Sequence, residues 1–466
     1  MNARNAPEDT ALTREQRATA LEGMSGTKGL DVLVVGGGIT GAGIALDAAA
    51  RGLRTGVVEM GDWASGTSAW SSKLIHGGLR YLYQLDVALV REALAERGRL
   101  LTTTAPHLVK AQPFLWPLKH HYERSYSAVG VGMYDALALA GAHGHRTVPA
   151  QKHLGHRGAR ALAPALDPSG FVGAIRFYDA RVDDARLVID LIRTAVGLGA
   201  LAAGRTKVTG FLTSPHGAVT GAAVTDLETG RAHEIRAART INATGVWTEA
   251  TQDLASGAGG LKVLASKGIH IVVPKEAIDA ETGIFLRTEK SVLFIIPWPR
   301  YWVIGTTDTP WAEDVSKPVA TSADVDYLLA HANEVLSRPL RRDDIIGVYA
   351  GLRPLLQPRL RPGADSRTAA STKVSREHTV TRVAPGLTAI AGGKLTTYRV
   401  MAADAVDHAL GEALARAHPC VTAGLPLVGA AGYRELAARA GAIARERDWT
   451  LARVTHLLDR YGDELP

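Results

Sequence analysis

The chain has 466 residues, of which 46% are hydrophobic and 21% charged, so it is long enough to form two or three domains with well-filled cores. These proportions, with 49 Gly and 21 Pro, exclude a disordered or fibrous protein. A net charge of +7 favours anionic partners (phosphates, acidic lipids or nucleic acid) without choosing among them. From the sequence we expect the surplus of positive charge to be spread thinly along the chain. No nucleic-acid-binding module is recognisable, so we predict no nucleic acid partner.

The single cysteine, Cys420, excludes an intrachain disulfide and a cysteine-based metal site, which fits a reducing compartment. The first thirty residues contain four acidic residues and no long apolar run, so they do not resemble a secretory signal. The least polar stretch, residues 127–142, contains Asp135 and is shorter than a bilayer span. We therefore expect a cytoplasmic protein that is able to touch a membrane but does not cross it.

The first half of the chain begins with a polar segment, residues 1–29, that we expect to be loose. From Asp31 the pattern of strand, glycine turn, helix and strand indicates a parallel α/β unit. Residues 100–170 are rich in His, Pro and Arg and are interpreted as an inserted region. Asp183 then predicts the N-cap of a helix that runs to the glycine at position 199.

The second half begins with short alternating runs that predict an antiparallel meander over residues 207–213, 218–226 and 233–239. A separate strand is expected at 240–244, and a strand-rich region follows Gly245 to about residue 310. From Leu395 onward the chain is predicted to be helical. One face of the first helix there is apolar, with Ala402, Ala405, Val406, Ala409 and Leu410.

The sharpest local signal is a strand from Asp31 that runs directly into a glycine-rich turn and a helix. In such a turn the first glycine makes the tight bend, the second lets the backbone approach a pyrophosphate, and the third lets the helix pack close to the strand. The helix N-terminus offers N–H groups and a partial positive charge to the diphosphate. We therefore predict dinucleotide contacts from Gly36, Gly37, Gly38, Ile39, Thr40 and Gly41.

The next strand, Thr55–Val58, ends in Glu59, whose carboxylate suits ribose hydroxyls and repels a 2′-phosphate. These features do not distinguish NAD from FAD. Two later strands that end in glycine, at Gly245 and at Gly392-Gly393, favour FAD. The second of them leads into a helix whose dipole would stabilise negative charge on a reduced flavin.

A longer signature follows Glu59 and reads Gly66-Thr-Ser-Ala-Trp-Ser-Ser-Lys-Leu-Ile-His-Gly-Gly-Leu-Arg-Tyr-Leu82. It resembles the FAD-dependent, quinone-linked glycerol-3-phosphate dehydrogenases. The resemblance continues in order through residues 90–97, 105–108, 178–187, 242–245, 267–274, 304–308, 351–355 and 392–398.

The resemblance implies an α/β fold in which a glutathione-reductase-like FAD-binding domain is interleaved with a D-amino-acid-oxidase-like substrate domain of antiparallel sheet and helices. A short helical C-terminal region follows, shorter than is usual in the family. The expected division is 30–99, 175–250 and 345–400 for the FAD-binding domain, 100–174 and 251–344 for the substrate domain, and 401–466 for the helical region.

The implied reaction is oxidation of sn-glycerol 3-phosphate to dihydroxyacetone phosphate by hydride transfer from C2 to FAD, with electrons passed to a membrane quinone. The implied location is peripheral, on the inner face of the cell membrane, and a homodimer is one open alternative. The FAD is expected to be held without a covalent bond. Further cofactor contacts implied by the matching positions are Met60, Ser71, Ser72, Lys73, His76, Gly77, Gly78, Gly245, Gly393, Lys394, Leu395 and Thr396.

The substrate pairs a phosphate dianion with a secondary alcohol, so it needs cations at one end and a proton acceptor at the other. Guanidinium groups suit phosphate because they donate parallel hydrogen bonds. The expected substrate contacts are Arg80, Tyr81, Arg353, Arg376 and Lys394. For Arg376, a place in the site and a place on the surface are equally expected.

His270 is the expected general base. It alternates with Ile269 and Ile271 on a predicted strand, and neighbouring cations should lower the pKa of its imidazole. The alternative is a buried histidine that is only hydrogen-bonded in the sheet. His76, just before the glycine pair, is a second candidate and is expected instead to lie beside the flavin.

No metal is predicted, because His120, His121, His143 and His145 lack acidic or cysteine partners at ligand spacing. Residues 113–122 mix apolar, aromatic and basic side chains, which is typical of a membrane-interface segment or of a loop packed on the core. Two further functions stay open: a glycerol-3-phosphate oxidase that uses O₂, and a flavin-binding protein without turnover.

Overall fold

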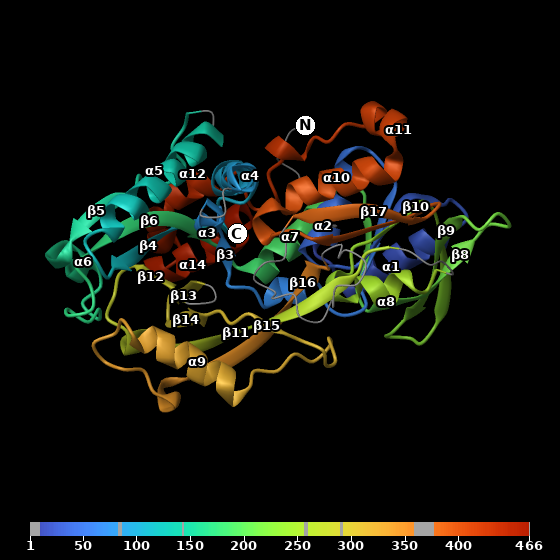
Figure 1. Ribbon diagram of the computed structural model, residues 1–466. Helices are drawn as coiled ribbons and strands as arrows, with labels where there is room; N and C mark the ends of the chain where they lie inside the picture. Colours follow the sequence, from blue (N-terminus) through green and yellow to red (C-terminus); the bar gives the residue numbers. More distant parts are fainter. Residues whose placement is uncertain are drawn as a thin grey trace, which may run out of the picture.

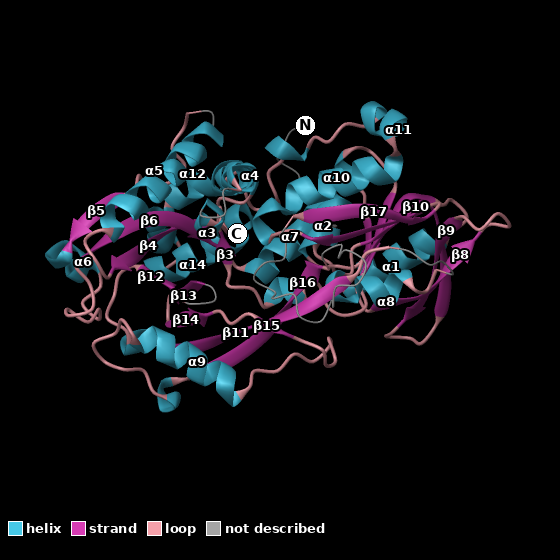
Figure 2. Cartoon of the chain, in the orientation of Figure 1, coloured by secondary structure: helices cyan, strands magenta, loops and turns pink. Residues whose placement is uncertain are grey.

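The computed structural model describes residues 10–82, 86–141, 144–255, 260–288, 292–357 and 377–465. The described strands form two sheets, one on the right of Figure 1 and one on the left. Helices cover both sheets (Figure 2).

The first sheet has the strand order β17-β18-β10-β1-β2-β7, and its central strands run parallel. Its central strand is apolar on both faces: Val32 and Val34 join one core, whereas Leu33 and Val35 join another. The strands are β1 (Leu30–Val35), β2 (Thr55–Val58), β7 (Leu201–Ala203), β8 (Thr206–Thr213), β9 (Val219–Asp226), β10 (Ala232–Asn242), β17 (His378–Ala384) and β18 (Leu387–Gly392).

Three helices contribute to the core on one face of this sheet: α2 (Ile39–Ala50), α7 (Asp184–Gly197) and α10 (Tyr398–Leu410). The predicted N-cap is confirmed, since the Asp183 carboxylate accepts the Arg186 N–H at 3.1 Å. The predicted apolar face of α10 is also confirmed, because all five of its residues are buried. We placed residues 401–410 in a separate C-terminal region; this is wrong, because α10 packs into the core of the first sheet.

The other face of the sheet is covered by α1 (Arg14–Ser25) and by the predicted meander, which is confirmed as β8–β9–β10. The expectation that the N-terminal segment is loose is wrong for the part that the structure describes. A capping box between Thr13 and Gln16 starts α1, and the helix residues Leu21 and Met24 are buried. The Arg17 guanidinium donates to the Gly204 carbonyl at 2.7 Å, which fastens the helix to the strands.

One strand, β10, belongs to both parts of this sheet. Its first half, from Ala232 to Arg236, pairs antiparallel with β9. Its second half, from Ala237 to Asn242, pairs parallel with β1. The two strands that we expected over 233–239 and 240–244 are therefore one continuous strand.

The second sheet has the order β15-β11-β14-β13-β12-β4-β6-β3, with β16 paired to β11 and β5 to β6. Its strands are β3 (Leu74–Ile75), β4 (Lys110–Leu118), β5 (Lys152–Gly155), β6 (Gly173–Arg181), β11 (Val263–Pro274), β12 (Gly283–Arg287), β13 (Val292–Pro297), β14 (Tyr301–Gly305), β15 (Thr309–Pro310) and β16 (Gly347–Leu356). The strand-rich region expected after Gly245 is thus confirmed.

Three expected domain boundaries are corrected by this pairing. Residues 74–75, 175–181 and 347–356 were assigned to the FAD-binding domain but lie in the second sheet. The largest difference is β16, which pairs with β11 from Val263↔Leu356 to Val272↔Gly347. Backbone pairing over that length decides which sheet the segment joins.

Helices pack on both faces of the second sheet. The helices α6 (His156–Leu162) and α9 (Ser322–Asn333) contribute to one core, and the short α3 (Leu79–Leu82), α4 (Val87–Arg99) and α5 (Glu123–Gly141) contribute to the other. Between these cores, Phe114, Leu115, Trp116 and Leu118 of β4 are buried. The membrane-interface interpretation of residues 113–122 is therefore wrong for 113–118, which form a core strand.

The remaining helices are short: α8 (Thr248–Gln252), α11 (Glu412–Ala417), α12 (Tyr433–Ala438), α13 (Ala440–Glu446) and α14 (Leu451–Tyr461). Ion pairs fasten the last of them to the rest of the chain, Arg460 to Asp183 at 2.9 Å and Arg193 to Glu464 at 2.6 Å. Among the helices that the structure describes, none is long and apolar enough to cross a membrane.

The glycine turn before α2 generates a first prediction. A Cβ on Gly41 would overlap the backbone carbonyl oxygen of Gly36, and backbone atoms cannot move aside as a flexible side chain does. We expect G41A to lower the free energy of unfolding by about 1–3 kcal/mol, the usual cost of overpacking. The matched control is G132A in α5, where a Cβ meets open space and helix propensity should add about 0.5–1 kcal/mol. Urea unfolding of both variants checks this, and equal effects would contradict it.

Candidate active site

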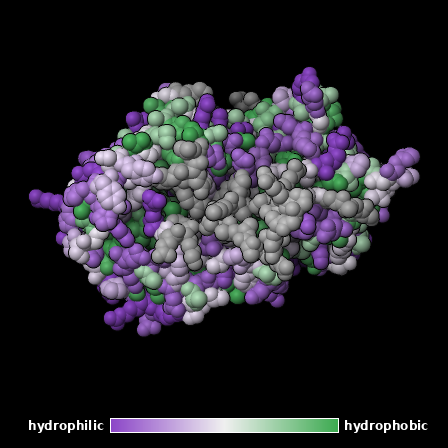
Figure 3. All heavy atoms as spheres, in the orientation of Figure 1, coloured by the Kyte–Doolittle hydropathy of each residue, from purple (hydrophilic) through white to green (hydrophobic). Residues whose placement is uncertain are grey.

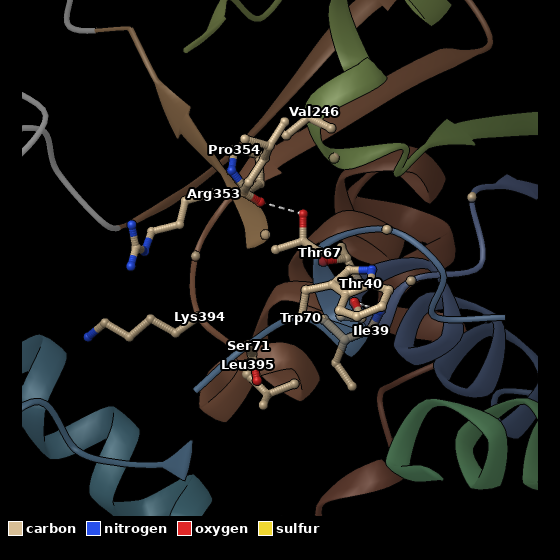
Figure 4. A pocket seen from close by; sticks show the side chains of 18 of the residues that line it. Ile39, Thr40, Thr67, Trp70, Ser71, Val246, Arg353, Pro354, Lys394 and Leu395 are labelled. Carbon is tan, nitrogen blue, oxygen red and sulfur yellow. Dashed lines mark hydrogen bonds between the residues drawn. The ribbon is translucent and has the colours of Figure 1, made fainter. Parts of the chain in front are cut away.

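A cavity of about 1020 Å³ is lined by residues of both sheets. One wall comes from the ends of β1, β2, β10 and β18, and another from aromatic residues of the second sheet, the buried Phe177 and Phe285 and the partly buried Phe294. The loop of residues 65–79 lines the space between them. Figure 4 shows part of this lining, with Thr67 and Trp70 near Ile39 and Thr40 of α2, and Ser71 near Leu395.

The glycine turn forms one end of the cavity, where Gly36, Gly38, Ile39 and Thr40 line the wall. Gly36 has a φ of +112°, and a Cβ there would lie 2.7 Å from the Ala243 carbonyl oxygen. The chain can therefore turn here only with glycine. Gly41 is absent from the lining because it packs on Gly36 instead, as expected for the third glycine of such a turn.

Glu59 lies at the end of β2 and lines the cavity together with Met60. Its two carboxylate oxygens accept the N–H groups of Gly37 and Gly61, each at 2.6 Å. Burial raises the pKa of the Glu59 carboxyl, while these two hydrogen bonds oppose the rise. Gly37 thus holds Glu59 rather than lining the cavity, and the carboxylate keeps lone pairs for ribose hydroxyls.

His76, Gly78, Gly245, Gly393, Lys394 and Leu395 also line the cavity. Thr396 does not, because its hydroxyl bridges the backbone of His76, accepting the N–H at 3.0 Å and donating to the carbonyl at 3.1 Å. Together with the glycine turn and Glu59, these residues line one cavity of about 1020 Å³. That arrangement fits an extended dinucleotide such as FAD.

The structure places Ser71, Ser72 and Lys73 differently from the predicted contacts with the FAD diphosphate. Lys73 does not line the cavity, and its ammonium pairs with the buried Asp184 at 2.6 Å. Ser71 lines the cavity, but its hydroxyl donates to the same carboxylate at 2.6 Å. A buried carboxylate needs such partners, so these residues hold the loop onto α7.

A second buried carboxylate, Asp179 of β6, holds the same loop at Gly77. Asp179 pairs with Arg97 at 2.6 Å and accepts the Tyr134 hydroxyl at 2.6 Å. The Tyr134 oxygen in turn accepts the Gly77 N–H at 2.7 Å. Gly77 is therefore an anchor and is not part of the cavity lining.

Sequence reasoning missed Asp179, Asp184, Arg97 and Tyr134 as site-forming residues. Asp179 and Asp184 both lie within the matched segment 178–187, so that segment carried the signal.

His270 is 2% exposed, and it lines the cavity from β11. Its Nε2 lies 2.8 Å from the Ser72 hydroxyl, and its ring stacks on Tyr349 at 4.7 Å with 16° between the planes. Burial, followed by the charges of Arg353 and Lys73, lowers the pKa of His270 to about 3. The imidazole is therefore neutral at physiological pH, is hydrogen-bonded to the loop through Ser72, and forms part of the cavity wall.

Two cations extend to the same side of the cavity, Arg353 from β16 and Lys394 from the turn after β18 (Figure 4). The Arg353 guanidinium donates to the Thr306 hydroxyl and to the Thr307 carbonyl, both at 3.1 Å. The Lys394 ammonium lies 4.2 Å from the centre of the Tyr81 ring, which also lines the cavity. Neighbouring residues thus hold both cations in place at the cavity wall.

The other predicted substrate contacts lie outside what the structure describes. The backbone of Arg80 is in α3, but its side chain is outside the description, and Arg376 is outside the described residues. Within the described part of the chain, no group of three or more His, Cys, Asp or Glu is arranged to hold a metal ion.

The neutral state of His270 generates a prediction about acid stability. In the folded chain the pKa of His270 is lowered to about 3, whereas in the unfolded chain the imidazole has its ordinary pKa of 6.5. Stability therefore falls as the pH drops from 6.5 towards 3, by about 2 kcal/mol between pH 7 and pH 5. In H270Q this loss is absent, so urea unfolding at both pH values should show a shallower decline. Parallel declines in the two proteins would contradict it.

The chain is similar to known proteins over most of its length. A family model described as FAD dependent oxidoreductase matches residues 31–399. The chain is 50% identical over 454 residues to a glycerol-3-phosphate dehydrogenase of Mycobacterium leprae (strain TN), which covers 97% of this chain and 75% of that protein. It is 34% identical over 464 residues to the mitochondrial glycerol-3-phosphate dehydrogenase of Homo sapiens, covering 96% of this chain and 60% of that protein.

Solved structures agree with these matches. The glycerol-3-phosphate dehydrogenase from Bacillus halodurans, complexed with FAD, superposes with a TM-score of 0.75 at 31% identity, over 96% of this chain and 78% of that one. An L-alpha-glycerophosphate oxidase from Mycoplasma pneumoniae with FAD bound shares the fold, with a TM-score of 0.62 at 18% identity, over 83% and 96% of the two chains. The fold class, the family and the cofactor expected from the sequence are confirmed. The chain belongs to the FAD-dependent oxidoreductase family, among the glycerol-3-phosphate dehydrogenases, and FAD is its cofactor.

Proposed function

We propose that this chain oxidises sn-glycerol 3-phosphate to dihydroxyacetone phosphate and passes the electrons to a membrane quinone. The observation that carries the proposal is a buried, neutral histidine at the same cavity as two cations. A phosphate monoester of a secondary alcohol needs both, a cationic site for its phosphate and a proton acceptor for its hydroxyl.

Arg353 and Lys394 are the proposed phosphate site. Arg353 is preorganised because one terminal nitrogen of its guanidinium donates to Thr306 and Thr307, while the other pairs with the Asp308 carboxylate at 3.4 Å. A planar guanidinium whose position is fixed in this way can donate parallel hydrogen bonds to phosphate oxygens, which an ammonium cannot reproduce. Lys394 adds a second positive charge, held over the Tyr81 ring.

His270 is the proposed general base. The Ser72 hydroxyl and the Tyr349 ring fix the position and the plane of its imidazole. In the proposed reaction the neutral imidazole takes the proton of the C2 hydroxyl, and the C2 oxygen becomes the carbonyl of the product. FAD, when bound, supplies the hydride acceptor for the hydrogen on C2.

A membrane quinone is the proposed electron acceptor, and peripheral contact with the inner face of the cell membrane is the proposed location. The support is the family, because proteins of 50% and 34% identity carry the name dehydrogenase, whereas the oxidase shares the fold at 18% identity. Purified enzyme should reduce a quinone analogue without air. Stoichiometric hydrogen peroxide in air, with no quinone reduction, would replace this acceptor by O₂.

The direct test of the proposed function is an anaerobic titration of the oxidised flavin spectrum. We expect sn-glycerol 3-phosphate to bleach the flavin band and glycerol to leave it unchanged at equal concentration, because only the phosphate ester engages Arg353 and Lys394. A flavin that ignores both compounds would indicate a binding protein without turnover. Bleaching by glycerol alone would remove the cationic site from the proposal.

The cationic site predicts a specific effect of R353K. The variant keeps the charge but loses the fork of hydrogen-bond donors, so we expect KM to rise about 10- to 100-fold. Flavin content should stay the same, because the substitution leaves the glycine turn and Glu59 intact. The control is R382K on the exposed side of β17, which should leave KM unchanged. An unchanged KM in R353K would exclude Arg353 from phosphate binding.

A further inference from the structure

One edge of the second sheet carries cations and aromatic residues that lie outside the cavity. Arg181 ends β6, and the strand register pairs it with Lys110 at the start of β4. Trp298, in the hairpin between β13 and β14, lies against Arg181. Lys275 follows β11 directly, and its N–H donates to the Arg300 carbonyl of the same hairpin at 3.2 Å. We call Lys110, Arg181, Lys275 and Trp298 the edge cluster.

Two tryptophan rings hold two of these cations in place. The Arg181 guanidinium lies 5.3 Å from the centre of the Trp298 ring, and the Lys275 ammonium lies 3.6 Å from the centre of the Trp302 ring. Trp298 in turn stacks on Tyr301 at 6.4 Å between ring centres. The face of an aromatic ring attracts a cation through its quadrupole, but the ring carries no net charge. The rings therefore fix the positions of both cations and leave their charges uncompensated.

The carboxylates beside the edge cluster already have partners. Asp459 pairs with Lys110 at 2.8 Å, and Asp183 pairs with Arg460 at 2.9 Å. These two ion pairs join the sheet edge and the start of α7 to α14. They use the negative charge that α14 and the N-cap of α7 bring to this edge.

Arg181 and Lys275 are the cations of the cluster that keep no such partner. Among the residues that the structure describes, neither side chain forms an ion pair or a hydrogen bond. Hydrophilic residues cover much of the surface in Figure 3, so exposed charge alone marks no site. These two side chains differ from that background because they are half-buried. A charge that is partly removed from water and lacks a partner is costly, so a bound anion would stabilise both.

The electrostatics of the cluster lead to the same conclusion. Burial lowers the pKa of the Lys275 ammonium, and the charge of Arg181 lowers it further. The same two causes lower the pKa of Lys110, whereas Asp459 opposes them. Asp459 is also the carboxylate that opposes the lowering of the Arg181 pKa by burial. One carboxylate thus serves two cations, and a third cation nearby has none.

We propose that the edge cluster binds a small soluble dianion that carries a phosphate group, through Arg181 and Lys275. A guanidinium packed on an aromatic ring keeps its N–H donors free at its edges. Those donors suit phosphate oxygens, and the ammonium of Lys275 adds a second positive charge. A dianion matches the two uncompensated cations in charge, whereas a single carboxylate matches only one of them.

The proposed site is separate from the cavity. Arg181, Lys275 and Trp298 all belong to the described part of the chain, and none of them lines the cavity. The nearest link is β6 itself, since Asp179, two residues before Arg181, does line the cavity. The proposed anion is therefore an additional ligand and not the substrate of the proposed reaction, and its binding does not depend on turnover.

The experiment is isothermal titration calorimetry of the FAD-loaded protein with inorganic phosphate at constant ionic strength. Wild type should bind one phosphate at the cationic site of the cavity and a second at the edge cluster. R181Q and K275Q should each bind the second phosphate about tenfold more weakly or not at all, because each removes one of the two charges. Binding by both variants that equals wild type would overturn the proposal.

Two further variants assign each phosphate to its site. R382Q removes an exposed arginine from β17 of the first sheet, and it should bind as wild type. R353K should weaken only the phosphate of the cavity. If R181Q does not fold, K275Q carries the test. Acetate should not displace the second phosphate at equal concentration, because a monoanion leaves one cation unmatched, and displacement by acetate would overturn the dianion site.

Flavin bleaching separates this site from the proposed function. sn-Glycerol 3-phosphate should bleach the flavin equally in wild type, R181Q and K275Q, because neither residue lines the cavity. Wild type that does not bleach would contradict the proposed function, while the titration would still count the phosphate at the edge. A variant that loses bleaching and keeps both phosphates would make Arg181 or Lys275 a support of the cavity and overturn the proposal.

Discussion

Two buried carboxylates, Asp179 and Asp184, fix the loop on which the cavity depends. Asp179 pairs with Arg97 and, through Tyr134, holds Gly77; Asp184 pairs with Lys73 and holds Ser71. Removing one partner of a buried ion pair costs about 3–5 kcal/mol, because the other charge stays buried without compensation. Asp179 finds its cation on α4, whereas Asp184 pairs with a lysine of the loop itself, so the loop between Ser71 and Gly77 is tied at both ends. Thr396 adds a third anchor at His76.

The reactive end of the cavity is set by strand register in combination with that loop. Pairing of β11 with β16 places His270 opposite Tyr349 and Ser266 opposite Arg353, so the imidazole and the guanidinium belong to adjacent strands of one sheet. The loop supplies Ser72 to the imidazole, and the turn between β14 and β15 supplies Thr306 and Thr307 to the guanidinium. Because no single segment carries all of these groups, the geometry exists only when the second sheet and the loop are assembled.

Local pattern was enough to predict the parts of this fold that depend on neighbouring residues. The glycine turn, the N-cap at Asp183 and the apolar face of α10 are confirmed because each is decided within a few residues. The partner strand of β16 was not predictable, since pairing with β11 is a contact between segments about 80 residues apart. The ammonium of Lys73 was assigned to a phosphate for the same reason. In the structure the Lys73 ammonium pairs with Asp184 of α7, and the sequence does not reveal that these two residues lie close together in space.

The charges around His270 also connect the binding of phosphate to the basicity of the histidine. Positive charge on Arg353 and Lys73 disfavours the imidazolium, in addition to the larger effect of burial. A phosphate dianion beside Arg353 would offset part of that positive charge and so raise the affinity of His270 for a proton. The base would therefore be strengthened when the phosphate is in place and would stay weak when only water or an uncharged alcohol fills the cavity. The proposed cationic site would therefore select a phosphate ester twice, once through the hydrogen bonds to phosphate and once through the electrostatic field that phosphate changes at the imidazole.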